Sequence, residues 1–273
     1  MNIGIIGQGF VGNAVKNKFE KFYNILTYDI DNSLCNSTLL EIKNNCKVIF
    51  LCLPTPMKKN GECDISRIYD TIKILSDKDE IIVVNKSTVV PGTTEKLNKE
   101  FKRIQIVFNP EFLTERNAIE DYENQNRIIL GGPRSATTIL KTIFSRVFPN
   151  VYLIKTGSKH AEMIKYFTNS FLATKVSFAN EMYDLCRKLD IDYDKVIEYA
   201  TLDKRIGFSH LAVPGPDGDL GFGGHCFPKD LAALIYLSEN IGSLNNVLNA
   251  VNNTNDKVRS NRDWERMKGR AIN

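Results

Sequence analysis

The sequence predicts an α/β fold in which a doubly wound, mostly parallel sheet is followed by an all-helical domain. Short β-branched runs alternate with helical patterns up to residue 156, and only helical patterns follow. Strands that alternate with helices are typical of βαβ units whose sheet is covered on both faces. A chain of 273 residues is long enough for two ordinary domains. We therefore expect one domain over residues 1–156 and a second over residues 157–273.

Seven apolar runs are expected to form the strands of the sheet. They are Asn2 to Gly7, Asn24 to Ile30, Lys47 to Pro54, Glu80 to Ser87, Ile104 to Pro110, Asn126 to Gly132 and Asn150 to Thr156. Helical patterns lie between several of these runs, at Gly12 to Phe22, Ser66 to Ser76 and Ser135 to Val147.

The second domain is expected to open with one long helix, for which Ser158 is a suitable N-cap residue. A short helix is expected near Asp194 to Ala200, and a loop rich in Gly, Pro and Asp occupies residues 203–224. Two further helices complete the chain. The last one carries an apolar stripe at helical spacing, formed by Leu244, Val247, Leu248 and Val251.

Composition and charge exclude several classes of protein. The net charge of +4 is small, and the basic residues from Lys257 to Arg270 are mixed with acids, so a solvated helix face is expected rather than a nucleic-acid surface. The six cysteines show no C-x-x-C pair and no zinc-ligand spacing, so no metal site is expected. The most apolar run, VIFLCLP, is too short to span a membrane, and no targeting segment is visible. A reducing cytoplasm is the expected location.

The segment GIIGQGFVGNAV places Gly7, Gly9 and Gly12 in G-x-G-x-x-G spacing, between a predicted strand and a predicted helix. In a Rossmann-type domain these glycines allow a tight turn, close approach of a pyrophosphate and close helix packing. Asp29 ends the next strand, where a carboxylate accepts hydrogen bonds from the adenosine ribose and favours NAD over NADP. A glycine turn without a ligand is the alternative.

The segment GFGGHCFPKD places Cys226 just before a predicted helix. Pro228 suits the first turn of a helix, and the helix dipole and Lys229 would both favour a thiolate. Glycines at positions 223 and 224 leave room for a substrate against the backbone. A nucleophilic thiol beside an NAD site points to oxidation through a thiohemiacetal and a thioester. From local sequence alone, a buried structural cysteine is an equally good interpretation.

Lys165 and Asn169 are four residues apart and project from one face of the long helix. In a cleft they would stabilise a developing oxyanion, but such a pair is also ordinary on a wet helix face. Glu111 and Glu115 follow a predicted strand end, where doubly wound sheets bind ligands. Acids at the start of a surface helix are the competing interpretation.

Taken together, these segments resemble the UDP-glucose and GDP-mannose 6-dehydrogenase family, and most closely its UDP-glucose 6-dehydrogenases. The matching parts are GQGFVG, LPTP, NKSTVVPGTT, NPEFLTE, KYFTN, RIGFSH, VPGPDGDLGFGGHCFPKD and the helix-rich second half. They occur in the order found in the family and cover nearly the whole chain. The resemblance therefore favours the functional interpretations of Cys226, Lys165 and the glutamates.

The resemblance implies a four-electron oxidation of the C6 alcohol of a nucleotide sugar, with UDP-glucose becoming UDP-glucuronate and two NAD being reduced. Cys226 would carry the thiohemiacetal and the thioester, while Lys165 and Asn169 would stabilise the oxyanion. A water held by Asp230 and Lys165 would take the hydroxyl proton. The implied catalytic residues are Cys226, Lys165, Asn169, Asp230, Glu111 and Thr88, the last two holding the water that hydrolyses the thioester.

The same resemblance implies which residues contact the ligands. Cofactor contacts are expected from Gly7, Gly9, Phe10, Val11, Gly12, Asp29, Thr55, Thr88, Glu115 and Lys229. Substrate contacts are expected from Glu111, Phe112, Leu113, Thr114, Lys165, Asn169, Arg205, Phe222 and Gly223.

The resemblance also implies an assembly. The C-terminal helix with the apolar stripe matches the dimer interface of the family, so a homodimer is expected; packing within its own chain is the alternative. Family members usually continue into a second Rossmann-like domain that holds the nucleobase. Because the sequence ends at Asn273, no counterpart of that domain is expected.

Two other functions fit parts of the sequence. β-Hydroxyacid dehydrogenases also combine an NAD-binding and a helical domain, but they perform one hydride transfer and need no thiol, so GGHCFPKD separates the two. A non-catalytic NAD-binding subunit of a full-length dehydrogenase is the other alternative. It would have no physical reason to keep Cys226, Lys165, Asn169 and Asp230 together.

Overall fold

The structure is a computed structural model that describes residues 1–273. The chain divides into two compact units. The first, the sheet unit, holds residues 1–55 and 65–165, and the second, the helical unit, holds residues 56–64 and 166–273.

A seven-stranded sheet forms the centre of the sheet unit, in the order β2-β1-β3-β4-β5-β6-β7. The strands are β1 (Asn2–Ile6), β2 (Asn24–Tyr28), β3 (Val48–Leu51), β4 (Ile82–Asn85), β5 (Gln105–Phe108), β6 (Arg127–Gly131) and β7 (Tyr152–Thr156). Neighbouring strands pair in parallel except β5 and β6, which pair antiparallel between Phe108 and Gly131. The mostly parallel sheet predicted from the sequence is confirmed.

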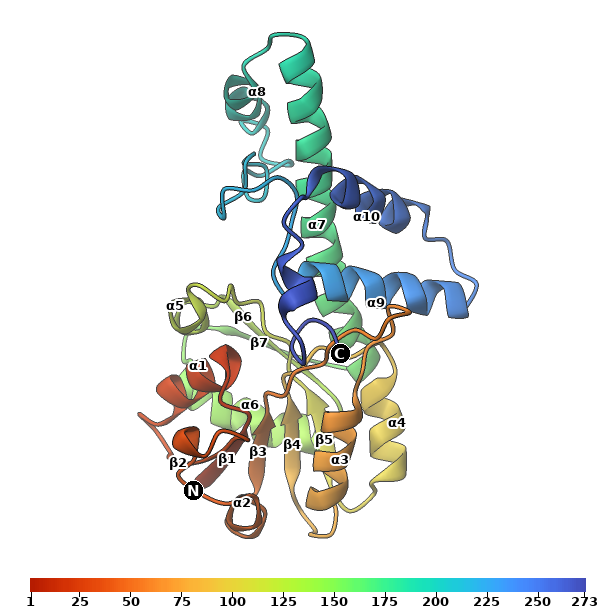
Figure 1. The fold of residues 1–273 in the computed structure, drawn as a ribbon. Coiled ribbons are helices and arrows are strands. Elements are labelled where there is room, and N and C mark those ends of the chain that lie inside the picture. Colours follow the sequence, from red (N-terminus) through yellow and green to blue (C-terminus); the bar gives the residue numbers. More distant parts are fainter. The chain divides into compact units, whose positions relative to one another are not determined.

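Helices cover both faces of this sheet (Figure 1). They are α1 (Phe10–Phe19), the 3-10 helix η1 (Asn32–Leu34), α2 (Leu39–Asn45), α3 (Ser66–Leu75), α4 (Thr93–Glu100), α5 (Ala118–Glu123) and α6 (Arg134–Val147). Successive side chains of a strand point to opposite faces. Accordingly, Val48 and Phe50 of β3 pack with residues of α1, α5 and α6, whereas Ile49 and Leu51 pack with residues of α2, α3 and α4. The predicted doubly wound α/β class is therefore confirmed.

The helical unit is built around one long helix, α7 (Ser158–Lys188), which starts in the sheet unit and continues beyond residue 166. Ser158 is the first helical residue rather than the predicted N-cap, because Ala161 donates to the carbonyl of Gly157. The other helices are α8 (Tyr193–Ala200), α9 (Phe227–Asn240), α10 (Asn246–Val258) and the 3-10 helix η2 (Asp263–Arg266). Figure 1 shows α8 at the C-terminal end of α7, and α9 and α10 crossing it.

The apolar stripe predicted on the last helix is divided in the structure. Leu244 precedes α10 and is 90% exposed, and Val247 is 65% exposed. Leu248 and Val251 pack instead with Leu231 in a core of the helical unit. For these two residues, packing within their own chain is correct.

The predicted solvated helix face between Lys257 and Arg270 is wrong in one important respect. The helix α10 ends at Val258, and Arg259 is only 3% exposed. Its burial has a structural reason, because the carboxylates of Asp217, Asp219 and Asp263 lie within 4 Å of its guanidinium.

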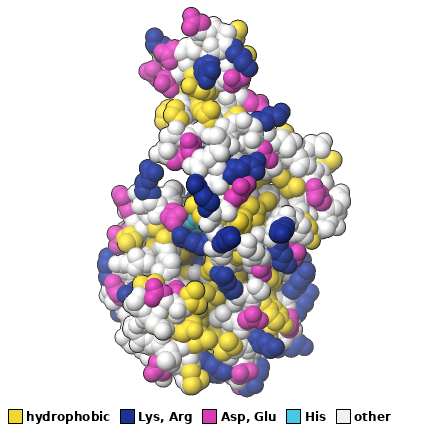
Figure 2. All heavy atoms as spheres, in the orientation of Figure 1, with side chains coloured by type: hydrophobic (Ala, Val, Ile, Leu, Met, Phe, Trp, Pro, Cys, Tyr) yellow, Lys and Arg dark blue, Asp and Glu magenta, His cyan; other side chains and the backbone are white.

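The helices do not combine the length and the apolar character that a membrane span requires. On the face drawn in Figure 2, basic and acidic side chains are interspersed over the sheet unit.

Candidate active site

The glycine-rich turn between β1 and α1 has the close packing that the motif predicts. Gly7 has a φ of 92°, and a Cβ there would overlap the carbonyl oxygen of Cys52. A Cβ on Gly12 would overlap the carbonyl oxygen of Gly7, so α1 lies directly against the turn. Gly9 faces open space, where a ligand can approach the backbone. Phe10 and Val11 are the first two residues of α1, at the end of the helix whose dipole favours a phosphate.

Asp29 follows β2 and is fixed beside this turn. Its carboxylate accepts the N–H of Gln8 over 2.6 Å and the N–H of Asp31 over 3.0 Å. A cavity of about 480 Å³, large enough for part of a dinucleotide, is lined by Gln8 and Cys35, and both of these residues are hydrogen-bonded to Asp29. Its walls are formed by Gln8, Gly9, Phe10, Asn13, Lys16, Thr27, Ser33, Leu34, Cys35 and Asn36. The residues present therefore fit the adenosine half of NAD.

Thr55 and Thr88 lie together beyond the carboxyl ends of β3 and β4. The hydroxyl of Thr55 donates to the carbonyl of Thr88 over 2.8 Å, and both residues are buried. The structure thus joins two residues that the sequence assigned to the site separately.

Glu111 and Lys165 form a buried ion pair. Nζ of Lys165 lies 2.8 Å from Oε1 of Glu111 and donates to its carbonyl oxygen over 2.7 Å. The other carboxylate oxygen accepts the N–H of Leu113 over 2.8 Å. Burial raises the pKa of Glu111, but the charge and hydrogen bond of Lys165 more than offset it, so the pKa is lowered. The ammonium also lies 5.6 Å from the ring centre of Phe112.

Not every residue of the NPEFLTE segment is buried. The N–H and the hydroxyl of Thr114 both donate to Asp121, over 2.7 and 2.6 Å. Thr114 and Glu115 are exposed, in contrast to Glu111 at the other end of the segment.

The sequence analysis missed one buried ammonium, that of Lys86. Its Nζ donates to Oδ1 of Asn109 over 2.9 Å, and burial lowers the pKa of Lys86 to about 8. Cys52 is close enough to interact with it, and burial raises the pKa of that thiol to about 12. The sequence feature that could have revealed Lys86 is the NKSTVV segment. It was quoted as part of a family motif, but its lysine was given no role.

In the helical unit, Cys226 is the N-cap residue of α9, as the sequence predicts, and Pro228 lies in the first turn of that helix. Cys226 is partly exposed, whereas Cys46 and Cys186 are buried. Lys229 pairs with Asp230. Burial lowers the pKa of Lys229, but the charges of Asp230 and Cys226 outweigh it, so the pKa is raised. This cationic side chain and the helix N-terminus both favour an anion at Cys226.

Asn169 and Asp230 are brought together in the same unit. Nδ2 of Asn169 donates to Oδ2 of Asp230 over 2.6 Å, and both residues are buried. The carboxylate is therefore held from one side by Asn169 and from the other by Lys229. Lys165 stands one helical turn before Asn169 on α7.

The remaining predicted substrate residues lie in different environments. Arg205 is exposed and pairs with Asp203. Phe222 is buried, and Gly223 packs against the side chains of Arg259 and Asp263. The sequence analysis gave no role to Arg259 or Asp263.

Comparison with known proteins agrees with both units. Residues 34–151 match the NAD binding domain of the UDP-glucose/GDP-mannose dehydrogenase family, and residues 159–257 match the central domain of that family. NAD is the cofactor of this first domain.

Individual relatives are similar over most of the chain. UDP-glucose 6-dehydrogenase of Rickettsia bellii is 37% identical over 255 residues, which cover 90% of this chain and 52% of the relative. UDP-glucose 6-dehydrogenase AglM of Haloferax volcanii is 32% identical over 304 residues, which cover 94% of this chain and 70% of the relative.

A solved structure, the UDP-glucose dehydrogenase of Pyrobaculum islandicum, superposes with a TM-score of 0.86 at 28% identity, covering 94% of this chain and 68% of that one. The chain spans about half the length of the Rickettsia bellii relative, at 52%. Both family models match this chain, and the chain covers 70% of a relative that is 32% identical to it. The chain belongs to the UDP-glucose/GDP-mannose dehydrogenase family.

Proposed function

We propose that this protein is an NAD-dependent dehydrogenase that oxidises C6 of a nucleotide sugar, converting UDP-glucose to UDP-glucuronate. The observation that carries the proposal is the position of Cys226 at the N-terminus of α9, close to the cationic Lys229. A single oxidation of an alcohol needs no thiol, whereas oxidation to a carboxylate uses one to hold the aldehyde. Relatives named UDP-glucose 6-dehydrogenase support the choice of sugar nucleotide.

In the first oxidation, a water held by Asp230 and Lys165 takes the proton of the C6 hydroxyl while hydride leaves the same carbon. NAD supplies the hydride acceptor in both oxidations. Asp230 suits this task because Asn169 and Lys229 already fix its carboxylate, so little reorganisation is needed. The carbon loses two electrons and becomes an aldehyde.

In the second oxidation, the Cys226 thiolate adds to the aldehyde carbon, and the carbonyl electron pair moves to oxygen. Lys165 and Asn169 donate hydrogen bonds to that oxygen, and protonation gives a thiohemiacetal. Loss of the hydroxyl proton and of a second hydride leaves a thioester. The covalent bond prevents the aldehyde from escaping between the two hydride transfers.

Hydrolysis releases the product. A water held by Thr88 and Glu111 attacks the thioester carbon, the C–S bond breaks, and the thiolate of Cys226 is restored. The lowered pKa of Glu111 keeps its carboxylate ionised, so that it can accept a hydrogen bond from the water and orient it. In total, one sugar gives up four electrons as two hydrides.

Ligand contacts and assembly complete the proposal. Residues 1–156 would bind NAD and residues 157–273 would carry the thiol, in a cytoplasmic homodimer formed through the C-terminal helix. The exposed Val247 of α10 supports the dimer, and six free cysteines support a reducing compartment.

The cofactor contacts are Gly7, Gly9, Phe10, Val11, Gly12, Asp29, Thr55, Thr88, Glu115 and Lys229. The substrate contacts are Glu111, Phe112, Leu113, Thr114, Lys165, Asn169, Arg205, Phe222 and Gly223.

The test is a stoichiometric assay with NAD and limiting amounts of UDP-glucose, UDP-N-acetylmannosamine or GDP-mannose. Two NADH per UDP-glucose, with the mass of a uronate in the product, is the expected result. One NADH per substrate would indicate a single hydride transfer, as in β-hydroxyacid dehydrogenases. NAD binding without NADH from any sugar would indicate a non-catalytic subunit.

A further inference from the structure

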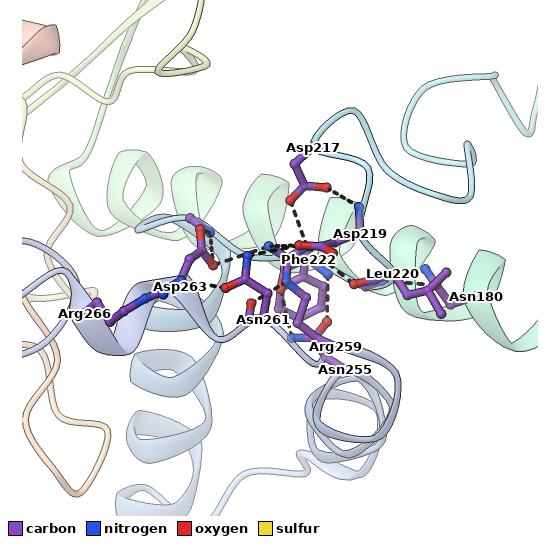
Figure 3. Close-up of polar contacts among 12 residues, drawn as sticks. Asn180, Asp217, Asp219, Leu220, Phe222, Asn255, Arg259, Asn261, Asp263 and Arg266 are labelled. Carbon is purple, nitrogen blue, oxygen red and sulfur yellow. Dashed lines mark hydrogen bonds and ion pairs between the residues drawn. The ribbon is translucent and has the colours of Figure 1, made fainter.

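One buried arginine joins the loop that precedes Cys226 to the end of α10. The side chain of Arg259 is 1% exposed. Its Nη1 donates to Oδ2 of Asp217 over 2.8 Å, and its Nη2 lies 3.4 Å from Oδ1 of Asp263 and 3.6 Å from Oδ2 of Asp219. Nε donates to the carbonyl of Asn261 over 2.8 Å. Figure 3 shows these groups converging from the loop and from the segment after α10.

The guanidinium of Arg259 and the carboxylates of Asp217, Asp219 and Asp263 stabilise one another. Three carboxylates surround one guanidinium, and Arg259 without them would be a buried, unpaired charge, which is strongly destabilising. Burial raises the pKa of Asp217, but the hydrogen bond from Arg259 contributes to lowering it overall. The arginine therefore fastens residues 217–219 to residues 259–263.

Two buried amides hold the next part of the same loop. Oδ1 of Asn180 on α7 accepts the N–H of Gly221 over 3.1 Å. Asn255 on α10 accepts the N–H of Phe222 over 2.7 Å and donates to its carbonyl over 3.0 Å. Both hydrogen-bonding groups of the Phe222 backbone are thus bound to one side chain.

The Arg259–Asp263 pair also forms the surface on which the last glycines lie. Asp263 accepts the N–H of Gly224 with both carboxylate oxygens, over 3.2 and 3.0 Å. A Cβ on Gly223 would overlap Nη2 of Arg259 and Oδ1 of Asp263. The backbone therefore lies flat against the ion pair immediately before Cys226.

We propose that Arg259 is a positioning residue for Cys226: through Asp263 and the acids of the loop, it holds residues 221–224 so that the thiol stays at the N-terminus of α9. The arginine does not touch the reacting atoms. Its influence on turnover rests on the proposed function, whereas its influence on the reactivity of the thiol does not.

The experiment compares Arg259→Gln and Arg259→Lys with Arg262→Gln in the full chain. Arg262 is a matched control, because it is partly exposed and pairs with Asp256 and Glu265 rather than with the loop. Alkylation of Cys226 by iodoacetamide is followed across pH by mass spectrometry of its peptide. NAD binding and thermal unfolding are measured in parallel, and kcat and KM are measured with UDP-glucose.

For Arg259→Gln we expect alkylation of Cys226 near neutral pH to slow by about tenfold, with the midpoint of its pH profile about one unit higher. We expect kcat to fall and NAD affinity to stay unchanged. Arg259→Lys should lie between this variant and the wild type, because an ammonium lacks the planar fork that contacts several partners. An unchanged alkylation profile in folded Arg259→Gln, or an equal effect of Arg262→Gln, would overturn the inference.

A second pair of variants covers the case in which Arg259→Gln does not fold. Asp263→Asn keeps an acceptor for the N–H of Gly224, whereas Asp263→Ala removes it. Slower alkylation in the alanine variant alone supports the inference, and equal alkylation in both overturns it. Because alkylation needs no sugar, a protein that oxidises no nucleotide sugar but shows these differences would refute the proposed function and leave the inference standing.

Discussion

Nζ of Lys165 lies 2.8 Å from Oε1 of Glu111, and the two side chains are only 3% and 7% exposed. Lys165 also donates to the carbonyl of Glu111, which fastens α7 to the segment after β5. Each of these buried charges depends on the other for its stability.

Lys165→Met is expected to lower the free energy of unfolding by about 3 kcal/mol, because it leaves the carboxylate of Glu111 buried without its cation. Urea unfolding measures the change. Lys21→Met is the matched control, because Lys21 forms a 2.7 Å ion pair with Glu123 that is largely exposed. An equally small effect of both substitutions would show that the buried pair contributes little.

The same pair predicts a pH dependence. Because the pKa of Glu111 is lower in the folded protein than in the unfolded chain, its stabilising effect is complete above the unfolded pKa. The effect is lost as the pH falls through the folded pKa. Glu111→Gln should therefore flatten the acid side of the curve of unfolding free energy against pH. A variant curve as steep as the wild-type curve would contradict this assignment.

Lys86 predicts a slope of the same sign on the alkaline side. Burial lowers its pKa to about 8, whereas an unfolded lysine has a pKa of about 10.4, so the unfolded chain binds this proton more tightly. Stability should therefore rise as the pH increases between these values, by roughly 3 kcal/mol, and Lys86→Met should abolish the rise.

Urea unfolding between neutral and alkaline pH provides the test for Lys86. Lys47→Met is the control, because Lys47 is exposed and pairs only with a surface glutamate, Glu80, in a 3.2 Å contact. It should keep the wild-type slope. If Lys86→Met also kept the wild-type rise of unfolding free energy with pH, burial of the Lys86 charge would not be the cause of that rise.

Asp29→Ala is expected to weaken NAD binding by at least about tenfold, because hydrogen bonds to a charged group contribute roughly 1.5–3 kcal/mol. The substitution also removes the acceptor that orients the N–H of Gln8. Calorimetric titration with NAD measures the loss. Asp77→Ala, at an exposed position far along the chain, is the control. Equal affinity of wild type and Asp29→Ala would show that the ribose contact is misassigned.

Thiol reactivity separates Cys226 from the structural cysteines. Burial raises the pKa of Cys46 to about 11 and that of Cys52 to about 12, so both are protonated near neutral pH. Iodoacetamide should therefore modify Cys226 well before these two. Peptide mapping over time measures the order, and labelling of Cys226 no faster than Cys52 would argue against a nucleophilic role.

Most of the fold was predictable because its signals are local. Strands buried on both faces appear as continuous apolar runs, and VIFL of β3 is an example in which every residue is buried. The antiparallel pairing of β6 with β5 was not predictable, because orientation depends on how the chain returns to the sheet rather than on the residues of the strand.

The candidate site was predictable residue by residue but not in its pairings. Glu111 and Lys165 were each recognised, yet their contact joins residues 54 positions apart. Arg259 was assigned to a solvated face because the basic residues from Lys257 to Arg270 are mixed with acids. Its burial depends on Asp217, which lies 42 residues earlier in the chain, and on the nearby Asp219. No local pattern reports such a contact.

The most direct test of the account is to isolate the sugar nucleotide bound to Cys226. Glu111→Gln should slow hydrolysis of the thioester, so this variant is mixed with NAD and UDP-glucose, quenched in acid and digested for mass spectrometry. We predict an adduct on the Cys226 peptide that requires both NAD and UDP-glucose, and Cys226→Ala that binds NAD but forms no uronate. Uronate formation by Cys226→Ala at the wild-type rate would show that the oxidation does not proceed through a covalent bond to this thiol.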